Sequence, residues 1–493
     1  MKQLGGCMRK IIAIILSLVV SLGLFIACAP RGGTEGNVNE DLGPLDGVTY
    51  VERTGELYKD TKEGKTRIKI SYTPGYGNAW VVQSARAFLL DEVGANYYFE
   101  FDSDSELTTS VSSKLEAGVG LSDIYFPLAS NWYNYAALGY LENLDSLYNM
   151  TIPGEDGTVL DKITGSWREY GKAVNNYETH YYVFPGNENI TGIVYNKSMF
   201  DQYGWTVPET TAELKALCEK IVADTNGKVA PFVYPGTVTG GYWDFIGTNW
   251  WLQVSGVDKL NEFMSFESAE VFNYASPSDP SYGKLKMLET FEDIIVKNRS
   301  TFTLRGSASK THLLAQVSFV NGEAAMIPNG NWIEKESLSS MKDEVRMMQT
   351  PRMEGAKQDE NGNYINYNYP GQPDYLLIPA KAQNKEGAKL FLAYMCKDEM
   401  LQMYTTYTGT PRPFDYDVMN CKTSDFIKSC LDIWSNSVTW FENSESDLWR
   451  ANKIKKFNAG SPYTTLLTQS DVISAIGWCA AEYSSVKNSW DTL

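Results

Sequence analysis

The strand–helix alternation between residues 67 and 127 constrains the fold of this 493-residue chain more than any other feature. Segments with apolar side chains at every second position alternate there with segments whose apolar side chains recur every three or four positions. The predicted order is a strand at 67–72, a helix at 81–89, a strand at 97–101, a helix at 107–115 and a strand at 122–127. Strands that alternate with helices form a parallel sheet with helices on its faces, so we expect an α/β fold.

A second region of the same kind begins near Ile193. A strand is predicted at 193–195, and Thr210 and Glu213 form a capping box ahead of a helix at 214–221. The remaining predicted elements are a helix at 313–320, strands at 324–328 and 375–379, and helices at 388–395 and 400–407, the last closed by Gly409. The length of the chain predicts at least two domains.

The N-terminal segment has the pattern of a secretion signal. Basic residues precede an apolar run that is shorter than the roughly 20 residues a membrane-spanning helix needs. The run ends in LFIAC at 24–28, which resembles a bacterial lipobox, although Phe25 stands where lipoboxes usually have leucine. Gly-rich and polar residues follow, as in a flexible tether. We therefore expect a signal peptide at 1–27, lipidation of Cys28 and a tether over 28–65; the alternative is a plain signal peptide with an unmodified cysteine.

The chain is acidic, with a net charge of −17. Removal of the signal peptide takes away Lys2, Arg9 and Lys10 and lowers this charge to −20. Nucleic acids and anionic lipid headgroups are attracted by positive charge, so we expect neither as a partner.

Cys7 precedes Cys28 in the chain, and five further cysteines follow it. Cys218 and Cys396 lie inside apolar helical patterns and are expected to be buried thiols, whereas Cys421 and Cys430 could form a disulfide or stay free. Neither the cysteines nor the two histidines have metal-ligand spacing, and GxSxG and Walker motifs are missing from the sequence. We expect no metal, no cofactor and no catalytic residue.

Three segments in sequence order carry a resemblance to a known family. Residues 184–217, FPGNENITGIVYNKSMFDQYGWTVPETTAELKAL, contain a strand ending in Tyr-Asn-Lys, a short helix and a Pro-Thr-containing turn before the next helix. Residues 319–332, FVNGEAAMIPNGNW, contain a small-residue strand that leads into Asn-Gly-x-Trp, and residues 377–413 end in Gly-x-Pro. Together they resemble the extracellular solute-binding proteins of family 1, the group that includes maltose-binding protein.

This resemblance implies a two-lobe, periplasmic-binding-protein-like fold of type II, in which each lobe has a central sheet flanked by helices. The lobes are joined by hinge crossings and close on a ligand. The N-terminal lobe would contain 66–186 plus 346–382, and the C-terminal lobe 187–345 plus 383–493. Hinges are expected near 185–190, 347–351 and 379–383, with the ligand between the lobes.

A sugar site needs aromatic rings for the C–H face of the pyranose, and amide, carboxylate and arginine groups for its hydroxyls. The chain has 13 Trp and 31 Tyr, several of them beside amides in predicted loops. The candidate ligand-binding residues are Tyr76, Asn78, Trp80, Asn131, Trp132, Asn187, Glu188, Trp243, Trp250, Asn331, Trp332 and Arg412. Trp332 is the strongest of them, because it stands in the Asn-Gly-x-Trp segment of the resemblance. The structural alternatives are core packing for each tryptophan and a surface ion pair for Arg412.

The sequence thus predicts a non-enzymatic, lipid-anchored solute-binding protein of an ABC importer on the outer face of the cytoplasmic membrane. It would act as a monomer, bind a carbohydrate, with an oligosaccharide favoured, and deliver it to the membrane permease subunits. One alternative is the same fold with a peptide or organic anion as solute, which should show clustered basic residues in the ligand loops. The other is a surface glycoside hydrolase, which needs two carboxylates beside the scissile bond.

Overall fold

The computed structural model describes residues 42–73, 79–127, 131–165, 167–175, 178–371, 373–441, 461–469 and 473–490 of the protein. The expected signal peptide and Cys28 lie outside these residues, as do the candidate ligand residues Tyr76 and Asn78.

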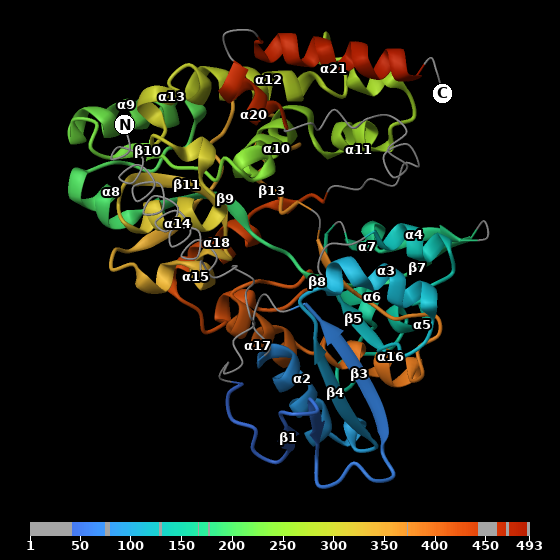
Figure 1. Cartoon of the computed structure of the whole chain (residues 1–493). Coiled ribbons are helices and arrows are strands. Elements are labelled where there is room, and N and C mark those ends of the chain that lie inside the picture. The colour runs from blue at the N-terminus through green and yellow to red at the C-terminus, as the bar shows by residue number, and fades with distance from the viewer. Residues whose placement is uncertain are drawn as a thin grey trace, which may run out of the picture. The chain divides into compact units, whose positions relative to one another are not determined.

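The larger sheet of the described residues has seven strands in the order β1-β2-β4-β3-β5-β14-β8 (Figure 1). At its centre β3 (Thr66–Tyr72) runs parallel to both β4 (Tyr97–Ser103) and β5 (Ile124–Phe126). The intervening helices are α2 (Ala79–Leu90) and α3 (Leu107–Ala117). The predicted alternation of strands and helices between residues 67 and 127 is therefore confirmed.

Antiparallel strands flank this parallel centre, so the sheet is mixed rather than purely parallel. The flanking strands are β1 (Thr49–Val51), β2 (Glu56–Tyr58), β14 (Asp374–Leu377) and β8 (Val183–Asn187). We call the residues that pack around this sheet the first lobe.

Strands β1 and β2 correct the prediction of a tether over 28–65. They pair with each other, and β2 also pairs with β4. The Leu57 side chain is fully buried in the core of the first lobe. An apolar side chain that is removed from water in this way stabilises the sheet, so residues 49–58 are part of the fold.

The second sheet has four strands within the described residues, in the order β10-β11-β9-β12. They are β9 (Thr191–Asn196), β10 (Ala230–Phe232), β11 (Ala324–Gly330) and β12 (Val345–Met348). Neighbouring residues of a strand point to opposite faces, so Ile193 joins one apolar core and Val194 another. Helices therefore cover both faces of this sheet, and we call these residues the second lobe.

The other elements surround the two sheets. In the first lobe they are α4 (Trp132–Ala137), α5 (Asp145–Tyr148), α6 (Val159–Lys162), α7 (Trp167–Tyr170) and the hairpin β6 (Lys172–Asn175) with β7 (Glu178–Tyr181). In the second lobe they are α8 (Lys197–Tyr203), α9 (Thr211–Thr225), α10 (Trp243–Ser255), α11 (Val257–Ser265), α12 (Tyr282–Phe291), α13 (Arg299–Phe302), α14 (His312–Val320), α15 (Ile333–Glu336), α18 (Asp425–Ser435), α20 (Ser461–Gln469) and α21 (Ala475–Trp490). The short strands β13 (Tyr367–Asn368) and β15 (Val438–Thr439) pair with each other.

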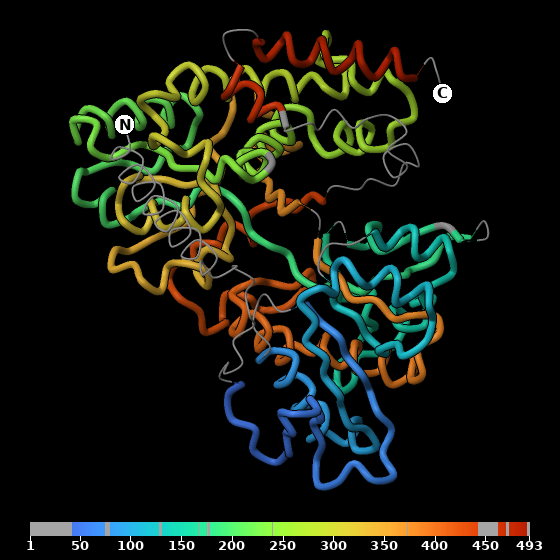
Figure 2. Tube along the Cα trace, viewed as in Figure 1, coloured from blue at the N-terminus to red at the C-terminus, as the bar shows by residue number. Residues whose placement is uncertain are grey.

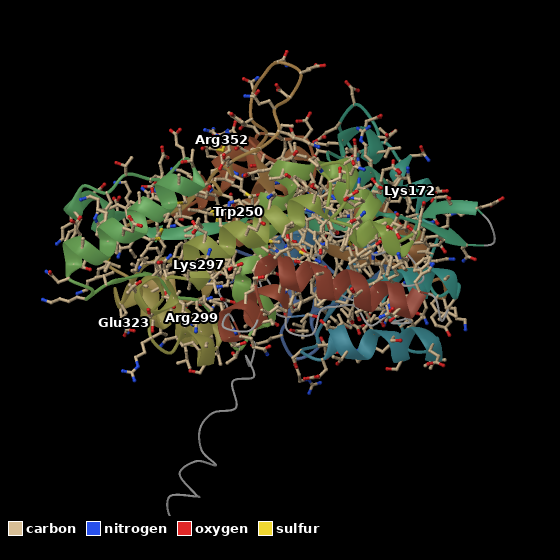
Figure 3. The ribbon with its side chains drawn as sticks, turned by 90° about the horizontal axis from the view of Figure 1, so that it is seen from above. Lys172, Trp250, Lys297, Arg299, Glu323 and Arg352 are labelled. Atoms are coloured by element: carbon tan, nitrogen blue, oxygen red, sulfur yellow. The ribbon has the colours of Figure 1, made fainter. Side chains whose placement is uncertain are left out.

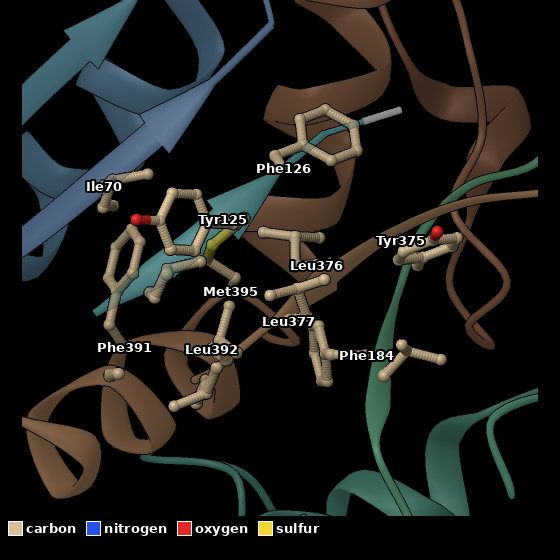
Figure 4. Close-up of a cluster of buried hydrophobic side chains, with 14 of the residues drawn as sticks. Ile70, Tyr125, Phe126, Phe184, Tyr375, Leu376, Leu377, Phe391, Leu392 and Met395 are labelled. Carbon is tan, nitrogen blue, oxygen red and sulfur yellow. The ribbon is translucent and has the colours of Figure 1, made fainter. Parts of the chain in front are cut away.

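The distribution of the later segments differs from the expected lobe boundaries in two places. Strand β12 pairs with β9 in the second sheet, although residues 346–382 were expected in the first lobe. Helices α16 (Lys385–Tyr394) and α17 (Asp398–Thr408) pack in the first core, although residues from 383 onward were expected in the second. Figure 4 shows the reason: Phe391, Leu392 and Met395 point into the apolar cluster formed by the strands of the first sheet.

The chain passes between the sheets at several points that can be followed in Figure 2. The first crossing joins the end of β8 to the start of β9, as the sequence predicts. A later one lies between β12 and β14. Because α17 still belongs to the first core, the next passage follows Thr408 and precedes α18, which differs from the expected hinge at 379–383.

The cysteines follow in part what the sequence suggests. Cys218 and Cys396 are buried, as predicted. Cys421 and Cys430 are both free thiols, so they do not form the disulfide that was one alternative. Among the described residues, no helix is both long and apolar enough to span a bilayer.

Candidate functional site

The first crossing, residues 185–191, is held by side chains from three later parts of the chain. Asn331 accepts a hydrogen bond from the backbone N–H of Ile190 at 3.0 Å. Its amide nitrogen donates to the Gly409 carbonyl at 3.0 Å and to Thr410 Oγ1 at 2.7 Å. The side chain is 2% exposed, so this candidate ligand residue fastens the crossing to the turn after α17.

Asn368 also holds the crossing and was not among the candidates. It accepts from the N–H of Thr191 at 3.1 Å and donates to the Asn189 carbonyl at 3.0 Å. The Thr191 hydroxyl in turn donates to the Tyr369 carbonyl at 2.7 Å. Two buried amides therefore satisfy the backbone of successive crossing residues, which fixes their conformation.

Arg412 completes this arrangement from the side of the first lobe. Its guanidinium donates to the carbonyls of Gly186 at 2.8 Å and Pro185 at 2.6 Å. A third bond reaches the Met395 carbonyl at 3.2 Å. The side chain is 1% exposed, so it is neither a surface ion pair nor open to a ligand in this structure.

Glu188 lies within the same crossing and is 3% exposed. Its carboxylate accepts a hydrogen bond from the Trp434 indole of α18. Burial raises the pKa of Glu188 to about 7, and the hydrogen bonds from Trp434 and Thr439 offset only part of this effect. The side chain therefore links the crossing to the second lobe and titrates near neutral pH.

Asn187, the last residue of β8, has no exposed surface, and neither atom of its amide has a hydrogen-bond partner among the described residues. The Tyr404 hydroxyl also lacks one. Burial raises the pKa of the Tyr404 phenol. An unpaired buried amide costs free energy, so this polar group stands out at the edge of the first lobe.

A cluster of aromatic side chains lies beside the crossing on the second lobe. We define the aromatic wall as Tyr242, Phe245, Trp332 and Tyr369. The Trp332 ring lies 5.5 Å from Phe245 and 6.0 Å from Tyr242, in edge-to-face geometry, and all three rings are partly exposed. Trp332 can fold back over its own strand because residue 330 is glycine; a Cβ there would lie 2.0 Å from Cζ3 of the indole.

Backbone strain marks Tyr242 within this wall. Gly240, Gly241 and Tyr242 adopt positive φ angles of 78°, 61° and 63° in succession, immediately before α10. Only glycine adopts this region without cost, so the strained tyrosine is held in place by its surroundings. Burial is the main cause that raises the pKa of Tyr242 to about 12, so the phenol remains a neutral donor and acceptor.

Most of the candidate tryptophans are core residues. Trp80 packs edge-to-face on Phe126 and Tyr404, and Trp132 donates to the Tyr170 hydroxyl at 3.3 Å. Both are less than 5% exposed, as are Trp243 and Trp250 in the second core. None of these four indoles presents a face to a ligand in this structure. Asn131, the N-cap residue of α4, is exposed.

The sequence thus led to Trp332 and to the crossing residues, but not to Tyr242, Phe245 and Tyr369. The signal for Tyr242 was the Gly240-Gly241 pair directly before a helix, which permits an unusual backbone. Within the described residues there is no cluster of three or more histidine, cysteine, aspartate or glutamate side chains that could hold a metal ion. The wall offers flat apolar rings with a neutral phenol, which suits the C–H face and hydroxyls of a sugar.

The structure is mixed α/β, with two sheets that are each flanked by helices and a crossing between them that buried side chains hold in place. These features define the two-lobe solute-binding class of type II. The solved structure of RafE from Streptococcus pneumoniae in its apo form is similar, with a TM-score of 0.62 at 16% identity over 87% of this chain and 99% of that one. A family 1 extracellular solute-binding protein from Bifidobacterium longum subsp. infantis has a TM-score of 0.59 at 17% identity over 87% and 100% of the two chains.

The family model for bacterial extracellular solute-binding proteins matches residues 93–401, and the chain belongs to this family. A multiple sugar-binding protein from Streptococcus mutans is 30% identical over 265 residues, which are 49% of this chain and 56% of that protein. The diacetylchitobiose binding protein NgcE from Streptomyces coelicolor is 25% identical over 53% and 51% of the two chains. The chain thus spans about half the length of these relatives.

Proposed function

We propose that this protein is the lipid-anchored solute-binding component of an ABC importer and that it binds an oligosaccharide between its two lobes. The observation that carries the proposal is the aromatic wall. Three partly exposed rings from two separate segments meet beside the clasped crossing. Burying an aromatic ring against the C–H face of a sugar is a main source of affinity in such sites.

The relatives support a sugar as the ligand. Two of them are named for a multiple sugar and for diacetylchitobiose, and RafE has been solved with raffinose. A peptide or an organic anion would need basic groups at the site. Arg412, the candidate basic residue near the crossing, has its guanidinium engaged by three backbone carbonyls.

The mechanism follows from the crossing. A sugar that contacts the wall and the first lobe together stabilises the closed arrangement relative to an open one, and the permease would receive the ligand from that form. Arg412 holds the crossing at Pro185 and Gly186, and Asn331 and Asn368 hold it at residues 189–191, so the change of dihedral angles on closure would fall on the short segment between these two ends, at the first of the expected hinges. The lipid on Cys28 would keep the protein at the membrane surface.

Calorimetric titration of Trp332→Ala against a panel of oligosaccharides tests the ligand site. Raffinose, diacetylchitobiose and xylo-oligosaccharides belong in the panel, and the wild type must bind at least one member. Loss of the indole should weaken that binding about tenfold or more, equivalent to about 1.4 kcal/mol, because the sugar loses its stacking surface.

Tyr203→Ala is the matched control, since Tyr203 is a 37% exposed aromatic residue of the same lobe outside the wall. Its affinity should equal that of the wild type. Unchanged binding by a folded Trp332→Ala variant would remove the wall from the site. Recovery of a cleaved sugar after incubation would replace the binding function by a hydrolase.

A further inference from the structure

A groove lies on the surface of the second lobe. It has a volume of about 1380 Å³ and lies between α9, α12 and the loop at 352–364. None of its lining residues belongs to the aromatic wall or to the first crossing. Pockets for small ligands usually measure about 300–1,000 Å³, so this groove has room for an extended molecule.

One wall of the groove is fastened to the core by buried side chains of α10. Asn249 donates to Thr350 Oγ1 at 3.1 Å, and the Trp250 indole donates to the Pro351 carbonyl at 2.9 Å. Gln253 accepts from the N–H of Met353 at 2.9 Å. Trp250 and Arg352 are both labelled in Figure 3. This wall is therefore preorganised, which lowers the entropy cost of binding.

The side of the groove that α10 holds in place presents an arginine stacked on an exposed aromatic ring. The Arg352 guanidinium lies 4.0 Å from the centre of the Tyr364 ring, and Tyr364 is 46% exposed. The Arg352 backbone is fixed by hydrogen bonds with Glu209 and Thr211 at 2.8 and 3.0 Å. No carboxylate pairs with the guanidinium among the described residues, so its donors are available to a ligand.

The opposite wall is built from α9 and α12 and contains a second cation–aromatic pair. Lys286 lies 5.5 Å from the centre of the Tyr282 ring and pairs with Glu289 at 2.8 Å. Lys215 of α9 reaches across to Asp293 at 2.8 Å. Asp293 belongs to a π-helical turn, Glu292–Val296, a distortion that is frequent at functional sites.

The charge of the groove indicates the chemistry of its occupant. Its lining contains four basic and four acidic side chains, so it is balanced, whereas the chain as a whole carries −17. Such a balance favours neither a polyanion nor a polycation. Tyrosine rings interspersed with hydrogen-bonding groups suit an uncharged polyhydroxyl chain.

We infer that this groove is a second carbohydrate-binding surface, which holds an extended polysaccharide chain outside the lobe crossing. The inference shares its ligand class with the proposed function but not its residues. A protein held at the membrane surface would thereby concentrate a polymer beside the site that captures its shorter fragments.

Affinity electrophoresis in native gels that contain soluble starch, xylan or galactomannan tests the inference. The full chain from residue 28 onward should be retarded by at least one polymer. The double variant Arg352→Ala/Tyr364→Ala should lose at least tenfold in apparent affinity for that polymer, and Tyr203→Ala should behave as the wild type. Trp332→Ala should be retarded as much as the wild type, because the aromatic wall and the groove share no residue.

Calorimetric titration of the same variants with short oligosaccharides separates the two sites. The double groove variant should bind them as tightly as the wild type does, whereas Trp332→Ala should bind them more weakly. Equal retardation of the wild type and the double variant, or no retardation by any polymer, would overturn the second surface whatever the titration shows. Retardation by the groove without any oligosaccharide binding would overturn the proposed function alone.

Discussion

Replacing Glu188 by glutamine is expected to remove a pH dependence from the stability of the protein. The folded state raises the pKa of this carboxyl from 4.5 to about 7, chiefly by burial. Between these values the folded protein holds a proton that the unfolded chain has lost. The contribution of this carboxyl to stability therefore falls as the pH rises through this interval, and this contribution no longer changes once the pH is well above 7. A shift of about 2.5 pKa units corresponds to about 3 kcal/mol.

Glutamine has nearly the shape of the neutral carboxyl, and its oxygen can still accept from the Trp434 indole. Urea unfolding at pH 5, 6, 7 and 8 should show Glu188→Gln gaining about 2 to 3 kcal/mol relative to the wild type over this range. All other titrating groups are common to both proteins and cancel in the difference. Glu116→Gln, at an exposed glutamate of α3, is the control and should show no gain.

A difference between Glu188→Gln and the wild type that stays constant from pH 5 to pH 8 would refute the reasoning. It would mean that the carboxyl is either solvated or neutralised by a cation in the folded protein. A stability advantage of Glu188→Gln that grows as the pH falls would mean that folding lowers the pKa of Glu188 instead of raising it.

Two further substitutions test the second lobe. Lys284→Met should lower the free energy of unfolding by about 3 to 5 kcal/mol in urea titration, because Lys284 and Glu482 form a buried ion pair at 2.6 Å and the carboxylate would be left alone; a loss that the further change Glu482→Leu fails to restore would contradict this. Tyr242→Gly should be about 1 kcal/mol more stable than Tyr242→Ala, because glycine alone adopts φ 63° without strain, and an alanine variant of equal or higher stability would show that the turn is unstrained.

The sequence predicted those elements whose signal is local. The alternating Ile68, Ile70 and Tyr72 of β3 and the capping box at Thr210 and Glu213 all have the predicted structure. Gly409 adopts a φ of 70° and ends α17, as its position after an apolar stripe predicts. In each case a few neighbouring residues determine the conformation.

The sequence did not predict features that depend on residues far apart in the chain. Strand β14 was predicted as a strand, but its antiparallel place between β5 and β8 depends on pairing across more than 180 residues. The tryptophans illustrate the same limit for the site. Trp243 and Trp332 both stand next to polar residues in sequence, yet one is 2% exposed in the core and the other belongs to the wall. The difference arises because Trp243 begins α10, which packs into the second core, and the neighbouring residues in the sequence do not show this.

The place of β14 has a consequence for the order in which the protein can fold. Within the part of the chain that the structure describes, strand β8 joins the first sheet only through β14, so this sheet cannot be completed before residue 377 has emerged. The described strands of the second sheet all end by Met348. The later-starting lobe can therefore form its sheet first, while the first lobe waits for strands separated by long stretches of chain, which slows folding.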